Sequence, residues 1–92
     1  MKYPLFSIRD KLSGFGWPTI DTNDQTATRN FAAAVNSPQQ NNMSFSPGDY
    51  DLYKVGFFDS DSGLVQPTDA GVPEFIISGS QVFGIRDKSL KE

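Results

Sequence analysis

The feature that most constrains how this chain folds is the stretch DYDLYKVGFFDSDSG at residues 49–63. Its first part alternates apolar and polar side chains, which is the period-2 pattern of a strand with one buried face. Its second part is a run of small polar residues that ends on Gly63, and such runs are typical of a turn between antiparallel strands. The stretch therefore predicts a strand, a turn at residues 59–63 and a return strand at residues 64–66.

One other segment has the pattern of an amphipathic helix. Thr22 and Gln25 match a capping box, and apolar side chains recur at helical spacing after them. We therefore expect a single helix at residues 22–36, with Pro38 preventing its continuation. Residues 37–47 are rich in proline, glutamine and asparagine, a composition that predicts a flexible loop.

Extended segments account for most of the remaining chain. The run EFIISG is more continuously apolar than the others and is expected to be a more central strand. The extended segments predicted outside the opening stretch lie at residues 3–10, 17–20, 74–79 and 81–86, and residues 87–92 are expected to be a frayed tail. The 92 residues thus predict one α+β domain over 1–92, a small antiparallel sheet of four to five strands with a single amphipathic helix packed on one face.

Composition argues against several classes of function. The chain has no cysteine and no histidine, so it lacks thiolate metal ligands and the usual general base near neutral pH. The run DSDSG resembles the start of a calcium loop, but the twelfth position of that loop needs a carboxylate and is Ala70 here. A turn is therefore favoured over a metal site. No catalytic constellation accompanies the aspartates, and we predict a protein that is not an enzyme and uses no metal or cofactor.

The charge of the chain limits how it would bind nucleic acid. With a net charge of −3 and eight lysines and arginines, DNA binding would need a local basic patch or base stacking. The sequence FSIRDK at residues 6–11 recurs as FGIRDK at residues 83–88, which would gather one basic patch if these were neighbouring strands. Arg9 and Lys54 are the best candidates for phosphate contacts, and Tyr53 and Trp17 for stacking. The full set of candidate contacts is Arg9, Lys11, Trp17, Tyr53, Lys54, Arg86 and Lys88.

The aromatic residues leave a second function open. Twelve aromatic side chains exceed what one small core can bury, and half-exposed rings serve a protein interface as well as a base-stacking surface. The alternative to DNA binding is therefore a homodimeric protein-interaction module that modulates another protein without contacting DNA. No segment is long and apolar enough to span a bilayer, so no membrane contact is expected.

Three segments together resemble the small non-structural protein of gokushoviruses, single-stranded DNA phages of the Microviridae. They are MKYPLFSIRD at residues 1–10, RNFAAAVN at residues 29–36 and DYDLYKVGFFD at residues 49–59 with the following Ser-Gly turn. The resemblance covers about the first two thirds of the chain. It implies a product that is made in the cytoplasm of the infected bacterial host and is not part of the capsid. The expected role is to assist single-stranded DNA replication or packaging, by binding DNA weakly or by binding a phage or host replication protein. In the alternative function, the protein that is modulated would be a phage or host protein.

Overall fold

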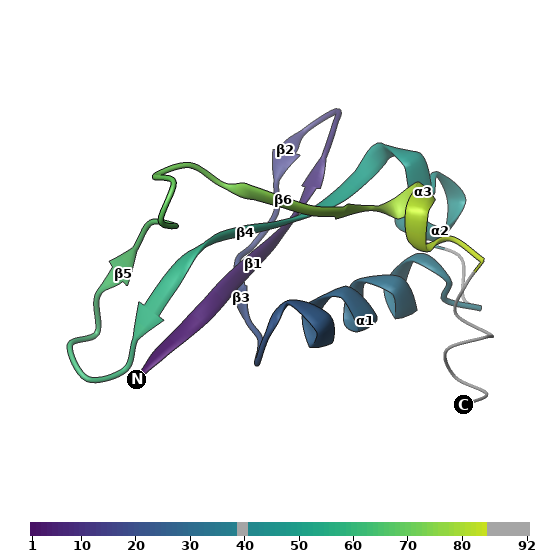
Figure 1. Cartoon of the computed structure of the whole chain (residues 1–92). Coiled ribbons are helices and arrows are strands. Elements are labelled where there is room, and N and C mark those ends of the chain that lie inside the picture. The colour runs from purple at the N-terminus through teal and green to yellow at the C-terminus, as the bar shows by residue number, and fades with distance from the viewer. Residues whose placement is uncertain (39–40, 85–92) are drawn as a thin grey trace.

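The computed structural model describes residues 1–38 and 41–84, which form one antiparallel sheet with a helix along one face (Figure 1). Strands β1 (Lys2–Asp10) and β4 (Tyr50–Asp59) pair along their whole lengths and make the middle of the sheet. The stretch at residues 49–63 therefore supplies a central strand, as its alternating pattern predicts.

Short strands occupy both outer edges of this central pair. They are β2 (Gly14–Phe15) and β3 (Thr19–Ile20) beside β1, and β5 (Val65–Gln66) and β6 (Glu74–Ser78) beside β4. The α+β class is confirmed. Among the residues that the structure describes, the sheet has six strands instead of four or five, because each edge is made of two short pieces.

Strand β6 was expected to be more central, and that expectation is wrong. Within the described chain β6 pairs only with β4 and forms part of an edge. Its register with β4 shifts between Leu52 and Tyr53, where Ile76 is an extra residue of β6, and both Ile76 and Ile77 pack against the core. The bulge breaks the usual alternation, which explains how an edge strand comes to have consecutive apolar residues.

Helix α1 (Asp24–Val35) confirms the predicted helix within two residues. It is capped by Asn23, whose side chain accepts a hydrogen bond from the Thr26 backbone N–H at 2.8 Å, and not by Thr22, the residue that matches the capping-box pattern. At its other end the Asn36 backbone N–H donates to the Ala32 carbonyl at 2.9 Å. The helix therefore begins and ends at asparagines that satisfy its terminal backbone groups.

The prediction of a single helix is wrong, because two further short helices are present. Helix α2 (Asn42–Phe45) lies in the segment expected to be a loop and is followed by a 3-10 turn at Pro47–Asp49. Helix α3 (Gly79–Val82) replaces the start of the strand predicted at residues 81–86. Reciprocal capping by Ser78 and Gln81 starts α3 and explains this difference. Residues 85–86 and the tail predicted at 87–92 lie outside the described residues.

The core lies between α1 and one face of the sheet. Phe6 from β1 and Leu52 from β4 pack with Val82 from α3, and α1 contributes its own apolar side chains, Ala27, Phe31 and Val35. Side chains alternate along β1 and β4. Ser7, which follows Phe6, and Tyr53, which follows Leu52, therefore point to the opposite face. We call that opposite face, turned away from α1, the open face.

The turn after β4 has the predicted position and a defined geometry. The Gly63 N–H donates to the Asp59 carbonyl at 2.7 Å, and Gly63 has a positive φ of 77°, which glycine adopts without strain. The Asp61 backbone N–H donates to the Asp59 carboxylate at 2.9 Å and, as the largest cause, holds the pKa of Asp59 below its usual value. The α-ammonium of Met1 lies 2.8 Å from the Asp61 carboxylate. The turn residues are thus engaged with their own backbone and with the first residue.

Candidate nucleic-acid interface

The open face carries a row of three aromatic rings, Phe15, Tyr53 and Phe75, which we call the aromatic row. Tyr53 meets Phe15 edge to face with ring centroids 5.2 Å apart, and meets Phe75 in the same way at 5.7 Å. β1 places Ser7 opposite Tyr53, and the small, buried Ser7 leaves room for the Phe15 ring to reach across β1. The row therefore joins three strands, β2, β4 and β6, over the central pair.

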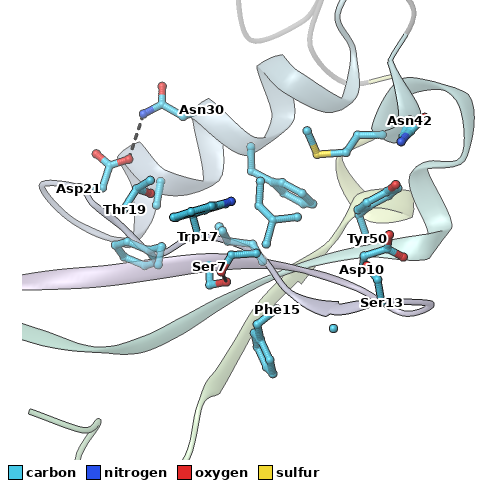
Figure 2. A pocket seen from close by; sticks show the side chains of 18 of the residues that line it. Ser7, Asp10, Ser13, Phe15, Trp17, Thr19, Asp21, Asn30, Asn42 and Tyr50 are labelled. Atoms are coloured by element: carbon cyan, nitrogen blue, oxygen red, sulfur yellow. Dashed lines mark hydrogen bonds between the residues drawn. The ribbon is translucent and has the colours of Figure 1, made fainter.

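The two outer rings of the aromatic row are accessible to solvent. Phe15 is 48% exposed and Phe75 is 53% exposed, while Tyr53 between them is half-buried. Figure 2 shows Phe15 pointing away from α1, on the far side of the sheet ribbon. Phe15 and Phe75 thus offer more free ring surface for stacking than the Tyr53 predicted from the sequence.

Arg9 supplies a positive charge at one end of the aromatic row. It pairs with Phe15 in the β1–β2 ladder, and its guanidinium carbon lies 5.9 Å from the centre of the Phe15 ring. The ring and the cation are therefore neighbours on one face, an arrangement that can contact a base and its phosphate together.

Lys11, also predicted as a contact, is held at the end of the sheet. Its ammonium donates to the Gly48 carbonyl at 2.8 Å and lies 4.0 Å from the carboxylate of Asp51. Asp51 is only 6% exposed, and its other carboxylate oxygen has no hydrogen-bond partner among the described residues. The Lys11 charge is therefore largely used to compensate this buried carboxylate.

Lys54 and Trp17 do not join Arg9 and Tyr53 on the open face. Lys54 follows Tyr53 in β4 and so points to the face covered by α1, where its ammonium lies 2.9 Å from the Asp24 carboxylate. Trp17 lies between β2 and β3, beside a groove on the α1 side of the sheet (Figure 2). The structure thus brings Arg9 and Tyr53 together and separates them from the other two candidates.

The remaining predicted contacts, Arg86 and Lys88, lie outside the described residues. The second copy of the recurrence that suggested a shared basic patch, residues 83–88, is described only at Phe83 and Gly84, which follow α3 and lie in no strand. Sequence reasoning did not select Phe15 and Phe75. Their aromatic character was visible, but their shared position with Tyr53 follows only from the strand register.

Two further features of the described residues bear on function. No three acidic side chains in the described chain are grouped so as to hold a metal ion. Within the same residues, no helix has the length and apolar character needed to cross a membrane.

Comparison with protein families gives one match. The family described as phage ORF5 protein matches residues 3–82, which includes every described helix and strand from Tyr3 onward. Searches of curated proteins and of solved structures found no significant match.

Proposed function

The chain belongs to the phage ORF5 protein family, and from this premise we propose that it is a phage accessory protein that binds single-stranded DNA on the open face and thereby assists genome replication or packaging. The observation that carries the proposal is the aromatic row with Arg9 beside it. The resemblance of the sequence to gokushovirus non-structural proteins supports the same role.

The geometry favours stacking over charge as the source of affinity. Base stacking on an aromatic side chain contributes about 1–3 kcal/mol per base and does not depend on sequence. Phe15 and Phe75 provide two such half-exposed rings, whereas the open face has a single described arginine beside them. With about one phosphate contact, the logarithm of the binding constant should fall with log salt at a slope near −0.7. Duplex DNA, whose bases are already stacked, should bind much more weakly.

Fluorescence anisotropy with a labelled single-stranded oligonucleotide and the matching duplex tests the proposal. Phe75→Ala should raise the dissociation constant for the single strand by about 5-fold to 150-fold, the equivalent of one lost stacking contact. Arg9→Gln should bring the salt slope close to zero. Phe45→Ala is the matched control, because Phe45 is 80% exposed in α2 and does not belong to the aromatic row.

Three results would contradict DNA binding on the open face. They are no binding even at low salt, equal affinity for the duplex, and an effect of Phe45→Ala as large as that of Phe75→Ala. Circular dichroism of each variant shows whether the fold is retained, so a loss of binding through unfolding is recognised.

One observation favours the alternative of a homodimeric interaction module. Strand β6 has an outer edge that pairs with no described strand, and its Phe75 is exposed beside that edge. A second copy that paired with this edge would cover the same ring. Light scattering that gives a dimer, dissociated by Phe75→Ala, together with the absence of oligonucleotide binding, would support this function in place of the first.

A further inference from the structure

We propose that the groove beside Trp17 binds a basic peptide segment of a partner protein, on the opposite side of the sheet from the open face. The groove has a volume of about 520 Å³ and runs between the β1–β3 edge of the sheet and helices α1 and α2. The half-buried apolar side chains of Ile8 and Met43 line part of it, above the buried core residues Phe6, Phe31 and Leu52. An extended chain could therefore place an aliphatic side chain on this surface.

Carboxylates mark two ends of the groove. Asp21 lies at one end, where its carboxylate accepts a hydrogen bond from the Asn30 amide at 2.9 Å (Figure 2). Asp10 lies at the other end beside Tyr50 and Asn42 (Figure 2). No lysine or arginine is among the described residues that line the groove, and neither carboxylate has an ion-pair partner in the described chain.

The ionisation of Tyr50 reflects the same negative field. Burial raises the pKa of Tyr50, and the negative charges of Asp10 and Asp49 raise it further. A hydrogen bond with the Asp10 carboxylate raises this pKa as well, so the hydroxyl at this end of the groove faces Asp10. A phosphate entering here would face two carboxylates, whereas an ammonium or guanidinium group would be attracted to them.

Trp17 supplies an anchor between these two ends. Its side chain is 91% exposed, and Figure 2 shows it between the Asp21–Asn30 pair and the Asp10–Tyr50 pair. An exposed indole attracts a cation to its face, and tryptophan is enriched among the residues that dominate protein interfaces. A ligand that matches the groove would have a cationic group at each end and an aliphatic residue between them. An extended basic peptide has these features. The net charge of −3 adds long-range attraction for such a partner.

The two surfaces differ in the ligand that their chemistry favours. The open face combines accessible rings with Arg9, while the groove combines Trp17 with Asp10 and Asp21. Because they lie on opposite sides of the sheet, one molecule could hold a DNA strand and a basic protein segment together. Phe15 borders the groove as well as belonging to the aromatic row, but Trp17, Asp10 and Asp21 belong to the groove alone. The groove proposal rests on these three residues and so does not depend on DNA binding.

Trp17 is the single tryptophan of the chain and so reports on the groove directly. The probe is a short peptide of alternating lysine and leucine, compared with a glutamate–leucine peptide of the same length. The basic peptide should shift Trp17 emission to the blue and bind more weakly as salt is added, because its contacts are electrostatic. The acidic peptide should cause no shift.

Charge-neutralising variants then locate the site. Asp10→Asn combined with Asp21→Asn should raise the dissociation constant of the basic peptide about 5-fold to 10-fold. Asparagine keeps the oxygen that accepts the Leu12 backbone N–H at 2.9 Å, so the local turn is retained. Asp69→Asn is the control, because Asp69 is exposed and does not line the groove.

Several outcomes would overturn the proposal. Equal binding of both peptides, or no emission shift with the basic peptide, contradicts it without any variant. An effect of Asp69→Asn equal to that of an Asp10→Asn or Asp21→Asn single variant would mean that only net charge matters. If oligothymidine displaced the peptide, or bound more tightly to the Asp10→Asn variant while shifting Trp17 emission, nucleic acid and not a peptide would be the ligand of the groove.

Discussion

Replacing Gly79 by alanine tests how α3 docks on the turn before β4. A Cβ added at Gly79 would lie well inside the contact distance of the Pro47 carbonyl oxygen, 2.9 Å from the Pro47 carbonyl carbon and 3.0 Å from the Tyr50 carbonyl oxygen. All three are backbone atoms, so no side chain can rotate to make room. The first turn of α3 would have to move away from the Pro47–Asp49 segment.

The cost follows from what moves with α3. Overpacking of this kind typically costs 1–3 kcal/mol, about what we expect here. Val82 is 1% exposed and packs in the core from α3, so its displacement adds to the cost. Alanine regains at most about 1 kcal/mol through its higher helix propensity. We therefore expect Gly79→Ala to lower the free energy of unfolding by about 2–3 kcal/mol and the Tm by about 10–20 °C.

Urea unfolding followed by far-UV circular dichroism measures this difference. Gly48→Ala is the matched control, since Gly48 lies in the facing turn and an added Cβ there meets no atom within 4 Å. The control should stay within about 0.5 kcal/mol of the parent protein. If Gly79→Ala were equally mild, the close docking of α3 on Pro47 would be refuted.

Three further predictions concern other parts of the fold. Lys54→Gln removes the ion pair with Asp24 and should lower the free energy of unfolding in urea by about 0.5–1 kcal/mol. The affinity for the oligonucleotide should not change, and a large loss of affinity would place Lys54 in the interface. The Asp61 backbone N–H holds the pKa of Asp59 below its usual value, so the stabilising charge of Asp59 is present at neutral pH and is lost in acid as the pH falls through this lowered pKa. Asp59→Asn should therefore flatten the fall of stability with acidification, and an unchanged slope would contradict this. Phe31→Ala should cost about 3–5 kcal/mol in the same unfolding assay, and a cost below 1 kcal/mol would argue against its burial.

The local elements could largely be predicted from the sequence because their signals are local. The alternating residues of β4 and the small polar run after it predicted a strand and a turn, and both are present. The periodic apolar residues of α1 predicted its extent within two residues. In each case the pattern arises from the repeat of the backbone itself, so neighbouring residues carry the information.

Helix α3 was missed because two local patterns competed there. Residues from Gln81 onward alternate like a strand, but Ser78 and Gln81 also have the spacing of a capping box. Burial of Val82 against α1 and the sheet accompanies the helical alternative. A single residue docked in the core can favour one local conformation over another by more than propensity does.

The candidate site was the least predictable part. Tyr53 and Lys54 are adjacent in the sequence, and strand alternation alone places them on opposite faces. Phe15 and Phe75 come from distant parts of the chain, and only the pairing of β2 with β1 and of β6 with β4 brings them to Tyr53. Stacking surfaces of this kind depend on register, which a single sequence does not reveal.

By itself, the sequence determined the α+β class, the central strand and turn at residues 49–63, and the principal helix. The tertiary structure alone decided that β6 is an edge strand, that α3 closes the core, and that Arg9 shares a face with the aromatic row while Trp17 stands beside an acidic groove. The physical reason is the range of the interactions. Helix and turn hydrogen bonds and apolar periodicity act within a few residues, whereas the two proposed surfaces are made of side chains that meet only when the sheet is assembled.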